Sequence, residues 1–151
     1  MKKRFSVIIV LAIFIFASCK SSDKDDFKQV VWSIFPDLNE GNISFIVIIP
    51  NQGCGGCITT AEFFYDRYKD KKELKFIFTN IISKKMLLQK NEINENNTYL
   101  DFDNNVLRAY PKDKRIYPCI IEIDNRRIKN IHYQSIGENG FEIIENKINP
   151  L

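Results

Sequence analysis

The residues of this chain best suited to chemistry are two cysteines, Cys54 and Cys57, separated by two glycines. Thiols at this spacing can form a reversible disulfide at the first turn of a helix, where the free N–H groups and the helix dipole favour a thiolate. The thiolate is the nucleophile in thiol–disulfide exchange. An apolar, β-branched run at 43–49 precedes the pair, and helical spacing of apolar residues follows it. A C-x-x-C between a buried strand and a helix indicates a redox centre.

Two other roles are open for the cysteine pair. A structural disulfide that closes so short a loop removes little entropy from the unfolded chain, so it stabilises weakly. A structural zinc site takes four ligands, and one C-x-x-C supplies two. His132, the single histidine, is the candidate additional ligand if the thiols carry copper. The redox role is favoured over both, and we expect neither a metal nor another cofactor.

The first residues have the pattern of an export signal. Lys2, Lys3 and Arg4 precede an apolar run at 5–17 that is too short to span a membrane comfortably and fits a signal peptide. Residues 16–19 resemble a bacterial lipobox, with Phe16 in place of the commoner leucine. This resemblance implies that Cys19 is acylated and becomes the first residue of the mature protein. An uncleaved anchor, or an ordinary signal with a chance cysteine, is the alternative.

The expected organisation is a lipoprotein signal peptide at 1–18, a flexible tether at 19–26 and one domain at 27–151. Attachment through lipidated Cys19 would place the domain in the cell envelope, on the periplasmic face of a membrane or at the cell surface. Residues 1–18 hold three of the 22 basic residues and none of the 19 acidic ones, so the rest of the chain has no net formal charge. Without a basic patch we expect no nucleic-acid partner.

Hydrophobic periodicity predicts an α/β fold with a central mixed β-sheet flanked by helices on both faces. Helical spacing begins at Phe27, and Pro36 ends that helix. Ser83 is the expected N-cap of a helix that runs to about Lys90. The remaining expected elements are helices after Cys57, at 104–110 and at 141–148, and strands at 43–49, 74–82, 99–102, 119–123 and 127–133.

Four stretches carry a family resemblance: SFIVIIPNQGCGGC, ELKFIFTNI, YLDFDNN and RIYPCIIEIDNRRIKNI. In these the chain resembles the small extracytoplasmic thioredoxin-like proteins of the thiol–disulfide interchange family (TlpA/ResA-like), over about 43–148. The resemblance implies a thioredoxin-like fold in which Cys54 attacks, Cys57 resolves the mixed disulfide and Pro118 shapes the substrate groove. It also implies a cis Tyr117–Pro118 bond facing the cysteines. A trans proline that begins a strand is the alternative.

The expected function is therefore that of a bacterial thiol–disulfide oxidoreductase of the cell envelope. Its partners would be protein thiols and disulfides, together with a redox partner that recycles the pair. The alternative function is that of a non-enzymatic binding module on the cell surface, with a structural or metal-binding cysteine pair.

The chain departs from the family pattern around the cysteines. The residues shortly before Cys54 are Asn51-Gln52-Gly53, where the family often has a tryptophan. The intervening pair is Gly55-Gly56, and the strand at 43–49 has no acidic residue. The direction of electron transfer is therefore open. Cys119 follows Pro118 directly. It is expected to be either a small buried residue or a third thiol near the cysteine pair.

Overall fold

A six-stranded mixed β-sheet runs through the chain in the computed structural model, which describes residues 23–39 and 43–149. The strand order is β3-β2-β1-β4-β5-β6. Strands β1, β2 and β3 are parallel, whereas β4, β5 and β6 each run antiparallel to the strand before them in this order. Their bounds are β1 Phe45–Pro50, β2 Leu74–Thr79, β3 Thr98–Asp101, β4 Cys119–Asp124, β5 Arg127–Ser135 and β6 Glu138–Asn139.

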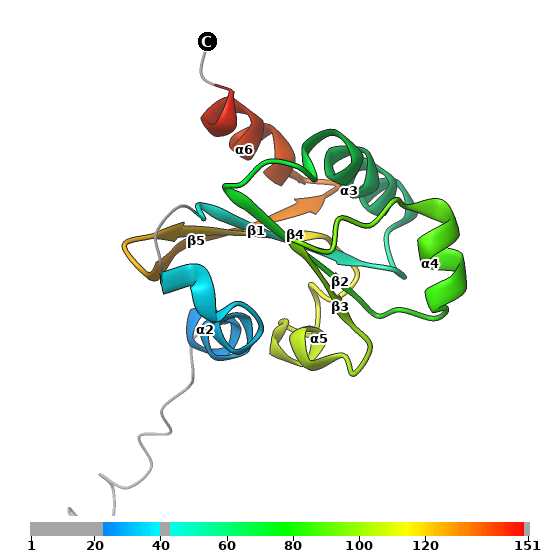
Figure 1. Cartoon of the computed structure of the whole chain (residues 1–151), viewed down its shortest axis with the longest axis horizontal. Helices are drawn as coiled ribbons and strands as arrows, with labels where there is room; N and C mark the ends of the chain where they lie inside the picture. Colours follow the sequence, from blue (N-terminus) through cyan, green and yellow to red (C-terminus); the bar gives the residue numbers. More distant parts are fainter. Residues whose placement is uncertain (1–22, 40–42, 150–151) are drawn as a thin grey trace, which may run out of the picture.

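Helices cover both faces of this sheet, as Figure 1 shows. Helices α3, α4 and α6 lie over one face, and α2 and α5 over the other. Their bounds are α2 Asp23–Ile34, α3 Gly55–Tyr68, α4 Lys84–Lys90, α5 Asn105–Ala109 and α6 Gly140–Ile148, with a short 3₁₀ helix η2 at Pro36–Asn39. The expected α/β class with a mixed, doubly covered sheet is confirmed.

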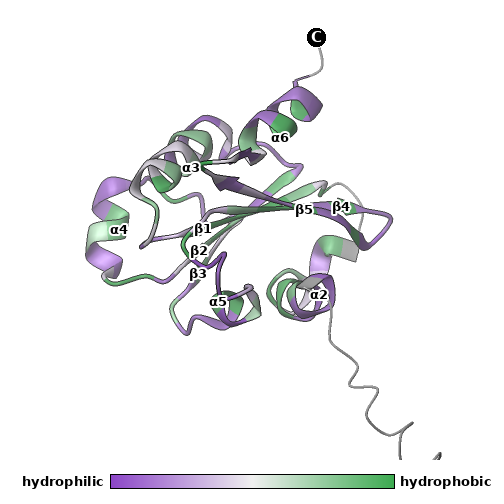
Figure 2. Ribbon diagram, turned by 180° about the vertical axis from the view of Figure 1, so that it is seen from behind, coloured by the Kyte–Doolittle hydropathy of each residue, from purple (hydrophilic) through white to green (hydrophobic). Residues whose placement is uncertain are grey.

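The side chains of β1 alternate between two separate apolar cores. Val47 and Ile49 join the core beneath α3, and Ile46 and Ile48 join the core on the α2 and α5 side. All six residues of β1 are buried, as expected of a strand in the middle of an α/β sheet. In Figure 2 the central strands are largely hydrophobic and the turn between β4 and β5 is hydrophilic.

Helix α3 is fixed on the sheet by aromatic contacts. The ring of Tyr65 is completely buried and lies edge-on to Phe76 and Phe78 of β2, with centroids 4.9 and 5.1 Å apart. The Tyr65 hydroxyl accepts a 2.9 Å hydrogen bond from the backbone N–H of Asn94. These contacts set the position of α3, and therefore of the cysteines at its first turn.

Two local sequence signals act as expected. The hydroxyl of Ser83 accepts a 3.3 Å hydrogen bond from the N–H of Met86, so Ser83 is the N-cap of α4. Helix α2 ends at Ile34, two residues before Pro36. The structure adds β6, which the sequence did not indicate because it is only two residues long.

Helix α2 begins earlier than the expected end of the tether. Asp23–Asp26, placed within the tether at 19–26, form its first turn. Asp25 and Asp26 are favourable there because the helix dipole is positive at its N-terminus. The Lys24 ammonium also donates a 2.7 Å hydrogen bond to the Lys129 carbonyl of β5. The expected signal peptide at 1–18 and lipidated Cys19 lie outside the described residues; within 23–39 and 43–149 no helix is long and apolar enough to cross a membrane.

Candidate functional site at the cysteine pair

Cys54 and Cys57 form a disulfide at the N-terminus of α3, with an S–S distance of 2.07 Å and Cα atoms 5.3 Å apart. Cys54 is the N-cap and has an extended backbone, while Cys57 lies within the first turn. Cys57 is buried and Cys54 is half-buried. The two residues therefore differ in access, and Cys54 is the one that an incoming molecule reaches first.

The first turn of α3 favours a negative charge on Cys54. The helix has no side-chain hydrogen bond at its N-cap and no acidic residue in its first turn. The backbone N–H groups of that turn and the helix dipole therefore act on the cysteine sulfur without competition from a carboxylate. Once the disulfide is reduced, such an environment would stabilise a thiolate.

Gly53 allows another segment to approach the cysteines closely. Its φ of 148° lies in the region that favours glycine, and a Cβ placed on it would lie 2.4 Å from the carbonyl oxygen of Ile116. The N–H of Cys54 donates a 3.0 Å hydrogen bond to that same oxygen. Sequence reasoning missed both residues. The one available signal was the glycine immediately before the first cysteine.

Pro118 lies two residues beyond this contact and is buried immediately before β4. Its carbonyl accepts a 2.9 Å hydrogen bond from the N–H of Gln134. No peptide bond among the described residues is cis, so the expected cis Tyr117–Pro118 bond is wrong. The trans form is the intrinsically favoured one, and here the proline simply leads into the strand. The structure still brings its segment to the cysteines, through Ile116.

Cys119 belongs to the opposite side of the sheet. It is fully buried in the core beneath α2 and α5, whereas α3 lies over the other face. Burial raises the pKa of the Cys119 thiol far above its usual range, although the neighbouring Tyr110 hydroxyl acts in the opposite direction. Cys119 is therefore a small buried residue of the core beneath α2 and α5, on the face of the sheet opposite α3.

His132 lies among carboxylates rather than among thiols. Its Nε2 is 3.9 Å from a Glu122 oxygen, and its Nδ1 is 4.0 Å from a Glu138 oxygen. Burial acts to raise the pKa of Glu122, but hydrogen bonds from Lys147 and Asn130 outweigh it and lower that pKa to about 2. Among the described residues no three histidine, cysteine or acidic side chains form a metal-binding group.

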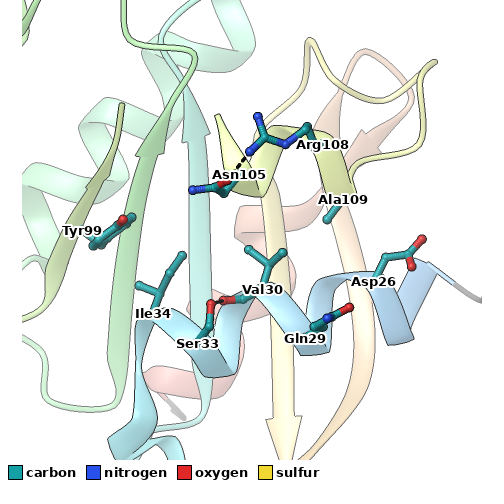
Figure 3. Close-up of a pocket in the computed structure, with 9 residues that line it drawn as sticks. All are labelled: Asp26, Gln29, Val30, Ser33, Ile34, Tyr99, Asn105, Arg108 and Ala109. Atoms are coloured by element: carbon teal, nitrogen blue, oxygen red, sulfur yellow. Dashed lines mark hydrogen bonds between the residues drawn. The ribbon is translucent and has the colours of Figure 1, made fainter. Parts of the chain in front are cut away.

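A cleft of about 690 Å³ lies on the face of the sheet away from α3. Figure 3 shows side chains of α2, α5 and β3 around it, including Val30, Ile34, Tyr99 and Arg108. The Arg108 guanidinium is held by the Asp103 carbonyl and the Asn105 side chain. The cleft is therefore separate from the disulfide, and no cysteine lines it.

No protein-family model, curated protein or solved structure matches this chain. The cysteine pair, its place at the end of β1 and the segment that contacts it are therefore the features from which a function is inferred.

Proposed function

We propose that this protein is a thiol–disulfide oxidoreductase with a thioredoxin-like fold. The observation that supports this most directly is the disulfide between Cys54 and Cys57 at the N-terminus of α3, directly after the buried strand β1. The β1–α3–β2 crossover, the β4–β5 hairpin and the final helix α6 support the fold assignment.

The reduced protein would act in two steps that conserve atoms and electrons. The Cys54 thiolate attacks one sulfur of a substrate disulfide, forms a mixed disulfide and expels the other substrate sulfur as a thiolate, which takes up a proton. Cys57, as a thiolate, then attacks the Cys54 sulfur and releases the remaining substrate thiol. The protein loses two electrons and the substrate gains them, and the reverse sequence oxidises a dithiol substrate.

The proposed order of attack rests on access. Cys54 is half-buried at the N-cap, whereas Cys57 is 7% exposed. An external disulfide meets Cys54 first, and Cys57 is held where it can attack only its neighbour. The contact between Gly53 and Ile116 joins the segment before β4 to the loop that ends at Cys54. This contact supports the proposal that Pro118, two residues beyond Ile116, lines the substrate groove.

We further propose that the domain works outside the cytoplasm as a bacterial lipoprotein anchored through Cys19. The lipobox-like sequence at 16–19 supports this placement. A thiol-based redox pair in the cell envelope needs a second redox protein to restore it after each turnover, so a recycling partner belongs to the proposal.

The proposal is tested with purified protein and the variants Cys54→Ser and Cys57→Ser. We expect Cys57→Ser to accumulate mixed disulfides with substrates and Cys54→Ser to form none. The reduction potential should lie in the range of exchange proteins, above about −300 mV. A lower potential together with no trapped adduct would identify the pair as a structural disulfide and overturn the proposal.

A further inference from the structure

Three segments surround the disulfide at the carboxyl ends of β1 and β2. The loop 51–53 leads into Cys54, the segment 80–86 follows β2, and the segment 111–117 precedes β4. Hydrogen bonds join them: Asn80 Nδ2 donates to the Gln52 carbonyl at 3.5 Å, and the Cys54 N–H donates to the Ile116 carbonyl. Each of the other two segments is therefore joined to the loop that leads into the cysteines, and we call the three segments together the surface around the cysteines.

A hollow of about 340 Å³ opens on this surface between the loop that precedes Cys54 and helix α4. Asn51, Ile82, Ser83 and Met86 are among the residues that line it. Ile82 and Met86 are each 68% exposed, and Ile116, in the neighbouring segment, is 48% exposed. Large apolar side chains thus face solvent around this hollow, and Asn51, one of its lining residues, precedes Cys54 by three residues.

Positive charge is concentrated on the same surface, although residues 19–151 as a whole are neutral. Segments 80–86 and 111–117 contain five basic residues and one acidic one, Asp113, while residues 51–60 contain no charge at all. Lys84, Lys85 and Lys112 form no ion pair within 23–39 and 43–149, and Lys84 lies only over the Phe102 ring. These cations are available to a partner, and the N-terminus of α3 adds to the positive potential.

We propose that this surface selects polypeptide substrates in which the reacting cysteine has an apolar neighbour and acidic neighbours. The apolar side chain would enter the hollow at Ile82 and Met86, and the carboxylates would face Lys84, Lys85 and Lys112. This inference rests on the proposed oxidoreductase function and adds the substrate class. Surface charges of this kind act mainly on the rate of encounter, and salt weakens them.

The test uses the full-length Cys57→Ser protein in detergent and three peptides of equal length, each carrying cysteine as a mixed disulfide with thionitrobenzoate. One peptide has leucine and two aspartates beside the cysteine, the second has leucine and two lysines, and the third has serine and two aspartates. Attack by Cys54 on the peptide sulfur forms a Cys54–peptide disulfide and releases thionitrobenzoate, whose absorbance reports the rate.

We expect the leucine–aspartate peptide to react roughly tenfold faster than the leucine–lysine peptide at low salt, with the ratio falling as salt is added. Lys85→Glu should reduce that ratio severalfold. Lys72→Glu is the matched control, because Lys72 is exposed between α3 and β2, away from the cysteines. Met86→Ser should remove the preference for leucine over serine. Leu88→Ser should not, because Leu88 is exposed on the same helix but outside the hollow.

Failure of this inference and failure of the proposed function give different results. Equal rates for the three peptides, unchanged by Lys85→Glu and Met86→Ser, would overturn the substrate class while leaving disulfide exchange supported. A second measurement uses neutral 2-hydroxyethyl disulfide and detects the Cys54 adduct by mass. The absence of an adduct with that reagent and with every peptide would overturn the oxidoreductase function itself.

Discussion

The backbone N–H of Cys54 donates a 3.0 Å hydrogen bond to the carbonyl oxygen of Ile116. This bond joins the loop that ends at the first cysteine to the segment that leads into β4, although the two residues are far apart in sequence. It exists because Gly53 has no side chain to keep the segments apart. The surface around the disulfide therefore depends on one glycine outside the C-x-x-C motif.

The first prediction concerns that glycine. Gly53→Ala would place a Cβ at 2.4 Å from a backbone oxygen and force alanine into a positive φ. We expect a loss of about 2 kcal/mol or more in the free energy of unfolding, together with slower disulfide exchange. Urea titration and a thiol-exchange assay measure the two effects. Gly56→Ala is the control, because nothing lies within 4 Å of a Cβ there; equal losses in both variants would contradict the proposed contact.

The second prediction concerns the residues between the cysteines. A Cβ at Gly56 meets open space, so Gly56→His should fold normally. An imidazolium beside Cys54 stabilises its thiolate and therefore the reduced form of the pair. We expect the reduction potential to rise by roughly 30 mV for each tenfold shift in the equilibrium with glutathione. A potential that stays constant while the measured pKa of the Cys54 thiol falls would contradict this reasoning.

The third prediction concerns pH. The pKa of Glu122 is about 2 in the folded protein, below its ordinary value of 4.5. Its carboxylate therefore stabilises the fold fully at pH values above 4.5. This stabilisation is lost as pH falls from about 4.5 toward 2, and it amounts to roughly 2–3 kcal/mol. Denaturant unfolding at several pH values should show a smaller acid-induced loss in Glu122→Gln than in the wild type. Glu95→Gln, at an exposed site, should show the same acid-induced loss of stability as the wild type.

The fourth prediction concerns Asp101, which is fully buried at the end of β3. Its carboxylate accepts hydrogen bonds from the Thr79 hydroxyl at 2.7 Å and from the N–H groups of Asn105 and Val106 at 2.9 Å. Asp101→Ala leaves these donors without an acceptor, and we expect a destabilisation of about 2–4 kcal/mol by urea unfolding. Asp103→Ala, in the exposed turn that follows, should cost much less; equal costs would show that the Asp101 network is not stabilising.

The fifth prediction concerns the β4–β5 turn. Asn125 and Arg126 have φ values of 48° and 62°, as a two-residue hairpin turn requires. Asparagine tolerates this conformation, but arginine is strained there. Arg126→Gly should therefore stabilise the protein by about 1 kcal/mol and raise Tm by several degrees. A lower Tm in scanning calorimetry would show that the arginine side chain stabilises the turn in another way.

Apart from the two-residue strand β6, the order of helices and strands was predictable because hydrophobic periodicity in this chain is strong. The residues of β1 are apolar without interruption. Ser83 lies directly before α4, and its hydroxyl accepts a hydrogen bond from the backbone N–H of Met86 in that helix. The position of the cysteines followed from the same reasoning, since the strand and the helix on either side of them could be recognised.

Features that depend on contacts between distant segments were not predictable. The sequence does not show that Ile116 meets Gly53, because this contact arises only when β4 pairs with β1. The side of the sheet on which Cys119 lies also depends on strand register. A shift of one residue would turn Cys119 toward the opposite face, since side chains alternate along a strand. The trans Tyr117–Pro118 bond corrects an expectation that came from resemblance alone.

The early start of α2 at Asp23 sets a length scale for the proposed lipoprotein. Only four residue steps separate the proposed acylated Cys19 from the first helical residue, and a chain of that length spans at most about 14 Å. A domain attached through so short a segment stays within roughly its own diameter of the bilayer. Substrates and the recycling partner would then have to come to the membrane surface. Access to the membrane would therefore select partners before they contact the surface around the cysteines.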